Sequence, residues 1–336
     1  MLRKMISRAW LAASLSAFLF ITGGCGSDKA PTRVGVVVAV DSLGGGGGDY
    51  LAQAGIRQLD KELSTEVYRE DCPGTDLSQA VAAGASRGAE VALVVGRGEM
   101  TLDLSGLDPR VPVVALDTVL RDGSGRLLGE EDGVTQVRYR VEEGAYLAGV
   151  LAAGVTTTRG LSGVNSDAVV AFIGCKGAAQ PEAWRLGFEK GVEAVNPNCA
   201  VAEYEVPSSA DVDNTRASVE AALKLKADVF FCAPGAFSRE VLALAGARGF
   251  LVIVSDAAED AADPEALLAQ TVLRDDLALF RAARSYLDGE LEEGELEWGR
   301  EENVIDFSVA PAHYSLLPSS LLQTLQQPVP RQLLPQ

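Results

Sequence analysis

The sequence predicts an α/β protein with two doubly wound, parallel-sheet lobes joined by hinge crossovers. Three observations predict this fold class. Short β-branched runs alternate with helical patterns along the chain, these runs are followed by Gly, Asp or Pro, and the pattern of the first half recurs in the second. With 336 residues, the chain is long enough for two domains of ~150 residues each.

Eight runs are expected to be strands, because each is short, rich in β-branched residues and followed by a turn signal. In the first half they are Val34–Val40, Thr65–Arg69, Glu90–Val95 and Val111–Leu116. In the second half they are Val169–Ile173, Val201–Val206, Asp228–Cys232 and Leu251–Ser255. Corresponding runs begin 135 to 140 residues apart, so the chain holds two similarly ordered units rather than one long sheet.

Helices between the strands are indicated by caps and by 3.6-residue periodicity. The clearest are Gln180–Val195, Asp211–Lys226 and Asp275–Leu287. In the first of these, Trp184, Phe188 and Val192 form a stripe at i, i+4 and i+8 that should pack on the sheet. This stripe favours a core role for Trp184 over stacking on a ligand.

Residues 1–24 have the features of a secretory signal. They contain basic but no acidic residues, and their apolar run from Trp10 to Ile21 is too short to span a bilayer. The run ends in Ile21-Thr22-Gly23-Gly24-Cys25, which resembles a bacterial lipobox, whose cysteine is lipidated. Residues 25–32 would then be a lipid-anchored tether on the extracytoplasmic side of a bacterial membrane, in the cell envelope. The alternative is an ordinary cleaved signal with a chance cysteine.

Charge, histidine and cysteine counts narrow the function classes. Lys and Arg total 29 against 47 Asp and Glu, a net charge of −18, which argues against binding along a nucleic acid backbone and suits a solvated surface. His313 is the only histidine, which argues against a metal site built from several histidines. No metal and no cofactor are expected. The cysteines after Cys25 allow up to two disulfides, whose connectivity the sequence leaves open. They are Cys72, Cys175, Cys199 and Cys232.

In open parallel sheets, ligands bind beyond the carboxyl ends of the strands, so residues at those ends are the candidate site. Asp41, Asp117 and Asp256 each follow an apolar strand directly, with no Lys or Arg beside them in the sequence. Such carboxylates suit a ligand rich in hydroxyl or amino donors, and the alternative is that each caps the next helix or turn. Gly44–Gly48 is interpreted as a flexible lid rather than a phosphate cradle. The other candidates are Asp49, Tyr50, Gly96–Gly98, Gly174–Gly177, Pro234 and Gly235.

Several longer stretches resemble a known family. They are VEEGAYLAGVLAA at 141–153, AVVAFIG at 168–174, GFEKGVEAVNP at 187–197, ADVFFCAPG at 227–235, LVIVSDA at 251–257 and YLDGELEEG at 286–294. These stretches are similar to the basic membrane protein (BMP) family of lipoproteins, which includes PnrA-like purine nucleoside receptors. The resemblance implies a type I periplasmic-binding-protein fold and a role as the substrate-binding protein of an ABC importer, often for nucleosides.

The same resemblance implies a set of ligand-binding residues, in which carboxylates, an aromatic ring and a cation hold purine and ribose. The matching positions here are Asp41, Asp49, Tyr50, Asp117, Asp256 and Arg274. The chain departs from the family pattern at Gly177, where an acid is common, and at Ser208, where a second aromatic ring is common. Loss of one stacking partner weakens the purine assignment more than the transport role.

The expected domains follow from the repeat and the resemblance. They are the signal peptide at 1–24, the tether at 25–32, a first lobe at 33–138 and 275–298, a second lobe at 139–274 and 299–327, and a tail at 328–336. Hinges near 136–141, 270–275 and 295–303 would let the two lobes close over a ligand.

The leading hypothesis is a lipid-anchored receptor, not an enzyme, that captures a small polar, nucleoside-like ligand and delivers it to an ABC permease. Its partners would be that ligand, the permease and the membrane through Cys25. An enzyme that processes nucleosides or sugars with cleft carboxylates is the alternative from another class. A sensory receptor, or a lipoprotein that has lost its ligand, is a third hypothesis.

Overall fold

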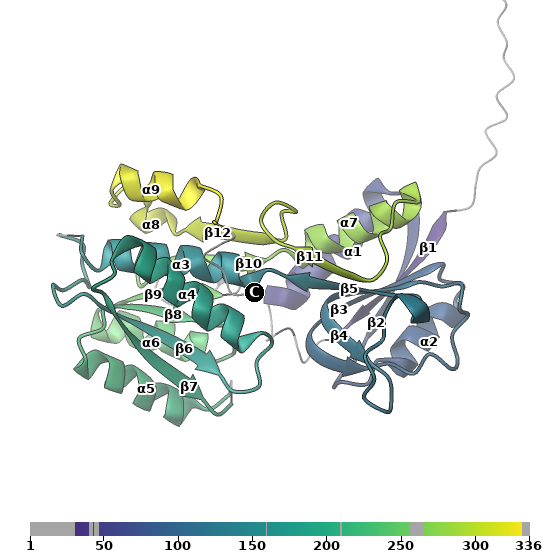
Figure 1. The fold of residues 1–336 in the computed structure, drawn as a ribbon, viewed down its shortest axis with the longest axis horizontal. Coiled ribbons are helices and arrows are strands. Elements are labelled where there is room, and N and C mark those ends of the chain that lie inside the picture. Colours follow the sequence, from purple (N-terminus) through teal and green to yellow (C-terminus); the bar gives the residue numbers. More distant parts are fainter. Residues whose placement is uncertain are drawn as a thin grey trace, which may run out of the picture. The chain divides into compact units, whose positions relative to one another are not determined.

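The structure, a computed structural model, describes residues 31–39, 43, 47–158, 160–208, 210–255 and 265–330. The strands of this part of the chain form two six-stranded sheets, in the order β11-β5-β4-β3-β1-β2 and β12-β10-β9-β8-β6-β7 (Figure 1). Two sheets rather than one confirm the predicted fold class. The exact lobe boundaries stay a prediction.

The first sheet is parallel throughout, whereas the second is parallel except for its edge strand β12. The strands of the first sheet are β1 Thr32–Val38, β2 Thr65–Asp71, β3 Val91–Thr101, β4 Val113–Arg121, β5 Val134–Tyr139 and β11 Glu295–Trp298. Those of the second are β6 Val169–Cys175, β7 Ala200–Val206, β8 Val229–Cys232, β9 Leu251–Ser255, β10 Leu267–Leu273 and β12 Ile305–Val309. The eight predicted strands are therefore all confirmed.

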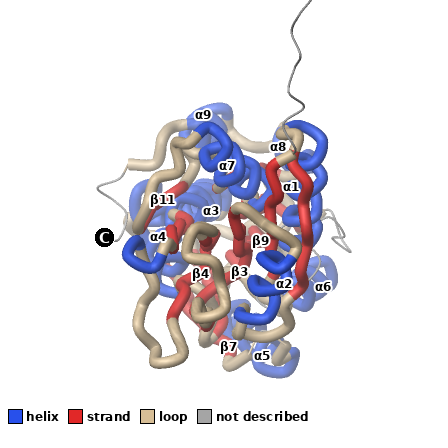
Figure 2. Tube along the Cα trace, turned by 90° about the vertical axis from the view of Figure 1, so that its right-hand side faces the viewer, coloured by secondary structure: helices blue, strands red, loops and turns tan. Residues whose placement is uncertain are grey.

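Helices cover both faces of each sheet, as Figures 1 and 2 show. The α-helices are α1 Gly47–Glu62, α2 Ser78–Ser86, α3 Val141–Val155, α4 Pro181–Val195, α5 Val212–Lys224, α6 Ser238–Arg248, α7 Asp275–Asp288, α8 Pro311–Tyr314 and α9 Ser319–Gln326. A short 3₁₀ helix, η1, spans Glu130–Asp132. In β6, Phe172 packs on the side of α3 and α4, and Ile173 packs on the side of α5 and α6. This alternation is what a strand buried on both faces requires.

The predicted helices are confirmed, and their local causes are visible. Trp184, Phe188 and Val192 of α4 are 1%, 0% and 2% exposed, so the predicted stripe is core. Asp211 caps α5 by accepting a hydrogen bond from the backbone N–H of Asn214 at 3.0 Å. Gly289 ends α7 in the left-handed conformation, as the Asp-Gly signal predicts.

Both sheets place their first two strands alike, since β1 lies between β2 and β3, and β6 lies between β7 and β8. In this arrangement the chain direction across the sheet reverses beside β1 and beside β6. Ligands in open α/β sheets bind at the carboxyl ends of the strands near such a reversal. The two structural halves therefore repeat the same potential binding edge.

The predicted carboxyl ends of two strands are wrong. We expected strands to end at Val95 and Leu116, but β3 continues to Thr101 and β4 to Arg121. Their pairing skips at the predicted ends, where Val95 lies opposite Leu116 and Gly98 lies opposite Thr118. Two residues of β3 thus face one of β4, as in a β-bulge, and pairing resumes beyond it. The turn signal at these positions marks a bulge, not a strand end.

The helices α3 and α4 lie side by side at unusually short range. A Cβ added at Gly149 would overlap the Phe188 carbonyl oxygen, and one added at Gly191 would overlap the Tyr146 carbonyl oxygen. These glycines are therefore needed for the close approach of two backbones. Because α4 is held this closely, the residues that precede it are placed with little freedom.

The chain passes between the two sheets at three places: from β5 to α3, from β10 to α7, and from β11 to β12. Hydrogen bonds tie these crossings together. The backbone N–H of Arg140 donates to the Trp298 carbonyl at 2.8 Å, and that of Arg274 donates to the Val304 carbonyl at 2.8 Å. The crossings coincide with the segments that the sequence suggests as hinges.

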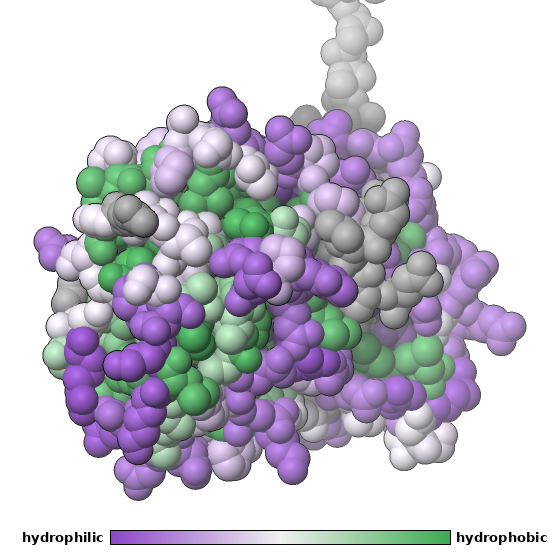
Figure 3. All heavy atoms as spheres, turned by 60° about the vertical axis from the view of Figure 1, so that its left-hand side comes forward, coloured by the Kyte–Doolittle hydropathy of each residue, from purple (hydrophilic) through white to green (hydrophobic). Residues whose placement is uncertain are grey.

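The surface exposes some large hydrophobic side chains. Exposed large hydrophobic side chains such as Val195, Val212 and Leu225 are separated along the sequence, and Figure 3 shows hydrophilic residues spread over one face among hydrophobic ones. Scattered exposure of this kind is ordinary for a folded protein. Among the described residues, no disulfide joins the four cysteines that could have paired, namely Cys72, Cys175, Cys199 and Cys232.

Candidate functional site

A buried charge cluster lies where β3 and β4 form their bulge. Arg97 lies on the bulged segment of β3, and Asp117 lies opposite in β4. Gly96 is needed beside them, because an added Cβ would lie 2.8 Å from Met100 Cε and 2.9 Å from Thr118 Oγ1. Asp117 has a φ of +50°, which non-glycine residues adopt rarely and which recurs at functional sites.

Arg97 links two carboxylates that are distant in the sequence. Its Nη2 donates to Asp275 Oδ2 at 2.8 Å, and its Nε lies 3.4 Å from Asp117 Oδ2. The guanidinium carbon lies 5.5 Å from the centre of the Tyr139 ring, and the Tyr139 hydroxyl donates to Asp275 Oδ1 at 3.2 Å. The side chains of Arg97, Asp117 and Asp275 are 12%, 3% and 0% exposed. The charges are therefore compensated within the fold rather than by solvent.

Burial governs the electrostatics of this cluster. It raises the pKa of Asp117 from 3.8 to about 7, although the Arg97 charge opposes the increase. Burial also raises the pKa of Asp275, again opposed by Arg97, and the pKa of Tyr139. Asp117 therefore titrates near neutral pH, which is uncommon for a carboxyl group and frequent at functional sites.

Gln180, the residue before α4, reaches this cluster from the second sheet. Its Nε2 donates to Asp117 Oδ1 at 2.7 Å, and its Oε1 accepts from Arg138 Nη1 at 3.0 Å. Arg138 lies in β5 of the first sheet. The polar groups at the carboxyl end of the first sheet are thus joined directly to a helix of the second.

A cavity of about 360 Å³ lies beside the start of α4, at the carboxyl ends of β6 and β8. This volume is within the ~300–1,000 Å³ of small-molecule pockets. Its lining includes Phe172, Gly174, Trp184, Arg185, Glu203 and Ala233. Phe231 packs between two of the lining aromatic rings, 5.9 Å from Phe172 and 6.0 Å from Trp184. The cavity therefore has an aromatic floor that the core holds rigidly.

Charged side chains also line this cavity. Arg185 forms ion pairs with Glu182 at 2.7 Å and with Glu203 at 3.5 Å. A hydrogen bond with the Glu189 carboxyl group, together with burial, raises the pKa of Glu203 to about 7. An aromatic floor and a wall of hydrogen-bonding groups suit a small ligand with a ring and polar substituents.

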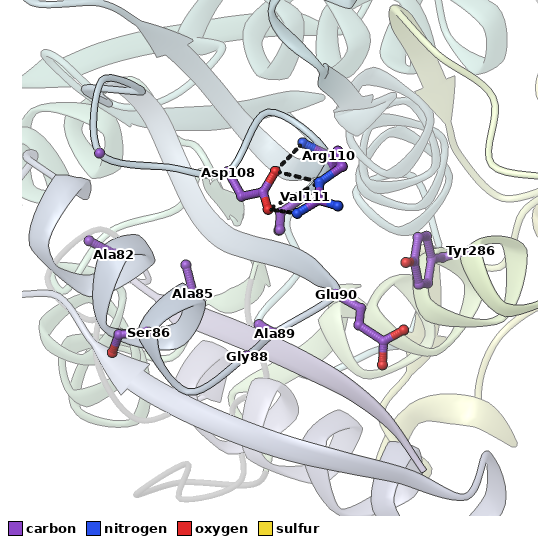
Figure 4. Close-up of a pocket in the computed structure, with 11 residues that line it drawn as sticks. Ala82, Ala85, Ser86, Gly88, Ala89, Glu90, Asp108, Arg110, Val111 and Tyr286 are labelled. Carbon is purple, nitrogen blue, oxygen red and sulfur yellow. Dashed lines mark hydrogen bonds and ion pairs between the residues drawn. The ribbon is translucent and has the colours of Figure 1, made fainter. Parts of the chain in front are cut away.

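A second cavity, of about 570 Å³, lies at the other edge of the first sheet (Figure 4). Its lining includes Glu90 and Val111, which precede β3 and β4. In Figure 4, Asp108 and Arg110 bond to each other on one side, and Tyr286 lies on another. This is the amino end of the strands, where open parallel sheets do not bind their ligands. We therefore assign the candidate site to the carboxyl edges.

Three of the predicted functional residues, Cys25, Asp41 and Asp256, lie outside the described residues. Asp49 and Tyr50 lie in the first turns of α1, which follows β1. The Asp49 carboxylate accepts a hydrogen bond from Arg69, whereas the Tyr50 ring is 50% exposed. Tyr50 is therefore accessible to a ligand, while Asp49 already has a charged partner.

Gly235 and Arg274 form none of the hydrogen bonds or ion pairs given above for the charge cluster, although Arg274 directly precedes Asp275. Gly235 follows β8, and a Cβ there would overlap the Phe237 ring, so only glycine fits. Arg274 pairs with Asp276 at 2.7 Å and is 30% exposed at the crossing from β10 to α7. Two strand-end candidates, Arg97 and Asp117, form an ion pair at 3.4 Å. Among the described residues, no hydrogen bond or ion pair links two of Asp49, Tyr50, Asp117, Gly235 and Arg274.

Three residues that complete the Asp117 environment were not among the sequence candidates, namely Tyr139, Gln180 and Asp275. Asp117 has no Lys or Arg beside it along the chain, but in space Arg97 is its neighbour. Arg97 was among the strand-end candidates, and its Gly-Arg-Gly context was the only local signal. For Gln180 and Asp275, the sequence indicated only that each stands at the start of a helix.

None of the described helices has the length and apolarity needed to cross a membrane. No group of three or more His, Cys, Asp or Glu side chains in the described ranges has the arrangement of a metal site.

Solved structures with the same architecture include binding proteins and regulators. A transcriptional activator of the comK gene from Bacillus halodurans has 18% identity and a TM-score of 0.66, over 87% of this chain and 94% of that chain. An ABC transporter solute-binding protein from Aeropyrum pernix K1 has 17% identity and a TM-score of 0.60, over 88% and 85%. A carbohydrate transporter solute-binding protein from Agrobacterium radiobacter, in complex with D-arabinose, has 16% identity and a TM-score of 0.58, over 89% and 99%. At these identities the likeness concerns the fold alone.

Comparison at the level of families is more specific. No curated protein matches the chain. The Bmp family model, described as ABC transporter substrate-binding protein PnrA-like, matches residues 36–332. This range begins within β1 and contains all other strands of both sheets and every described part of the candidate site. It confirms the resemblance drawn from the sequence. The chain belongs to the Bmp family of PnrA-like ABC transporter substrate-binding proteins.

Proposed function

We propose that this chain is a lipid-anchored, extracytoplasmic receptor of an ABC importer that captures a small, nucleoside-like ligand between its two sheets. The observation that carries the proposal is the hydrogen bond from Gln180 to Asp117. Through it, the polar carboxyl end of the first sheet adjoins the helix whose start lines the cavity of the second. Membership of a substrate-binding family supports ligand capture and delivery to a permease.

The groups available on the two edges match the donors and acceptors of a nucleoside. Asp117 can accept hydrogen bonds from hydroxyl or amino groups, and exposed Tyr50 can stack on a base. Contributions from Asp41, Asp49, Gly235, Asp256 and Arg274 remain part of the proposal.

A thermal-shift screen of purine and pyrimidine nucleosides tests the ligand class. A ligand at 100 times its Kd should stabilise the protein by ~2.7 kcal/mol. The variant Asp256→Ala should lose this shift and keep the melting temperature of the unliganded protein. A screen in which sugars, but no nucleosides, raise the melting temperature would replace the nucleoside assignment and leave the receptor role in place.

The lipid anchor has its own test. Cys25→Ala should release the protein from membranes and remove its labelling by a radioactive fatty acid, because the thiol carries the lipid. Cys199→Ala is a control, since this half-buried cysteine lies in the folded body. Fatty-acid labelling that survives Cys25→Ala would contradict the anchor.

One observation favours an enzyme, namely the pKa of Asp117 near 7, which suits a general acid or base. However, both oxygens of this carboxylate already have protein partners, Gln180 on one and Arg97 on the other. The receptor is therefore the better function. Incubation with adenosine and inosine, followed by chromatography, distinguishes the two, because an enzyme would release the free base or another product.

A further inference from the structure

The contact between Gln180 and Asp117 also has a consequence for the unliganded protein. Asp117 Oδ1 accepts from Gln180 Nε2 at 2.7 Å and from the Tyr139 backbone N–H at 3.3 Å, and Oδ2 lies 3.4 Å from Arg97 Nε. The side chain is 3% exposed. Oδ1 therefore already accepts two hydrogen bonds, one for each lone pair. A ligand that binds Asp117 through Oδ1 must displace one of these donors.

Of the three partners, Gln180 is the one that comes from the other sheet. Tyr139 and Arg97 lie on β5 and β3, neighbours of β4 in the first sheet, whereas Gln180 precedes α4, which packs on the second. A separation of the two sheets would break the Gln180 bond and leave the other two intact. This bond is therefore sensitive to the relative position of the sheets.

The amide of Gln180 is held at both of its polar atoms. Nε2 donates to Asp117, and Oε1 accepts from Arg138 Nη1 at 3.0 Å. An acidic acceptor on one side and a cationic donor on the other allow only one orientation of the amide, and both bonds are charge-assisted. Arg138 is itself anchored by Glu142 and Glu297, at 3.1 and 2.7 Å.

The backbones at both ends of this bond have an uncommon conformation. Asp117 has a φ of +50° and Gln180 a φ of +51°, both in the left-handed region that non-glycine residues rarely adopt. Such conformations persist where surrounding contacts determine them. Here the β3–β4 bulge fixes one end, and the start of α4, which is packed closely on α3, fixes the other.

We propose that Gln180 is a clasp that holds the two sheets together in the unliganded protein by occupying the Asp117 carboxylate. The clasp needs no ligand and does not depend on which ligand the receptor takes. For any ligand that uses Asp117, the side chain of Gln180 is an internal competitor, so the clasp lowers apparent affinity and favours ligands that can replace its N–H donor.

Small-angle X-ray scattering of ligand-free protein tests the clasp. The protein is first unfolded and refolded to remove any ligand that co-purifies. Gln180→Leu, which keeps the size but removes the amide, should increase the radius of gyration. Gln180→Asn, which keeps the amide but is one methylene too short, should do the same. Gln58→Leu is the matched control, since within the described part of the chain its side chain bonds to Glu62 alone, on the surface of α1.

The scattering experiment and the ligand screen can fail independently of each other. A larger radius of gyration for both Gln180 variants, with Gln58→Leu unchanged, supports the clasp. Radii equal to that of the wild type in folded Gln180 variants overturn it. Circular dichroism tests whether each variant is folded. If Gln180→Leu does not fold, the radius of gyration of Gln180→Asn decides the question. Because no ligand is added, a failure of the clasp leaves the proposed receptor function untouched, and the reverse also holds.

Discussion

The guanidinium of Arg97 lies 2.8 Å from the carboxylate of Asp275, although the two residues are 178 positions apart in the chain. Arg97 belongs to β3, whereas Asp275 begins α7, after the chain has formed most of the second sheet and returned to the first. Both side chains are buried. This pair links α7 to β3, the strand that carries the candidate site.

Removal of the buried cation should destabilise the protein strongly. Arg97→Met leaves Asp117 and Asp275 buried without their common partner, which should lower the free energy of unfolding by about 3–5 kcal/mol. Urea unfolding followed by circular dichroism measures this change. Arg110→Met is the control, because the Arg110 side chain is 87% exposed and, among the residues that the structure describes, pairs with Asp108 alone. Its loss should therefore change the unfolding free energy little. Equal effects of the two substitutions would show that the Arg97 cluster is not a unit.

Stability should depend on pH through Asp117. Its pKa is raised by burial from 3.8 to about 7, so folding favours the protonated form. The stabilisation is complete below about pH 4 and is lost as the pH rises to about 7, with a slope of at most ~1.4 kcal/mol per pH unit. Asp117→Asn, which does not ionise, should remove this part of the pH dependence in unfolding experiments between pH 4 and 8.

Asp122→Asn is the matched control for this titration. A hydrogen bond from Ser124, together with others, lowers the pKa of Asp122 to about 2. The stabilisation that the ionised Asp122 carboxylate contributes is therefore present above pH 4 and lost only as the pH falls toward 2. Asp122→Asn should leave the slope of the unfolding free energy against pH unchanged above pH 4. A wild-type profile that matches that of Asp117→Asn from pH 4 to 8 would argue that Asp117 is ionised throughout.

The contact between α3 and α4 should not tolerate a methyl group. Gly191→Ala places a Cβ on the Tyr146 carbonyl oxygen, and separating the helices should lower the unfolding free energy by about 1–3 kcal/mol. Gly84→Ala in α2 is the control, because its Cβ would meet only the Gly35 Cα, at 3.7 Å. That variant should be as stable as the wild type or more stable, by up to ~1 kcal/mol, since alanine favours a helix. Thermal or urea unfolding ranks the two.

Tyr50 should affect binding without affecting stability. If its exposed ring stacks on a base, Tyr50→Ala should weaken adenosine binding by about 1–3 kcal/mol, measured by isothermal titration calorimetry. Tyr314→Ala is a close control, since that ring is also 50% exposed but lies in α8. Unchanged adenosine affinity in Tyr50→Ala would remove Tyr50 from the site.

Much of the fold could be predicted from local patterns. The strands of both halves, and the stripe of Trp184, Phe188 and Val192 in α4, follow from periodicity, which depends only on near neighbours in the chain. The repeat of about 140 residues established that there are two sheets. The same local signals misplaced the ends of β3 and β4, because a bulge and a strand end both begin with turn-forming residues.

The chemistry of the site was decided by the tertiary structure. The sequence by itself determined the family, the two-sheet architecture and the presence of Asp117 near a carboxyl edge. It did not determine that Arg97 neutralises this carboxylate, that Asp275 completes the cluster, or that Gln180 reaches it from the other sheet. The reason is physical: burial, pKa and hydrogen-bond partners depend on strand register and on packing between segments far apart in the chain, and local periodicity contains no information on either.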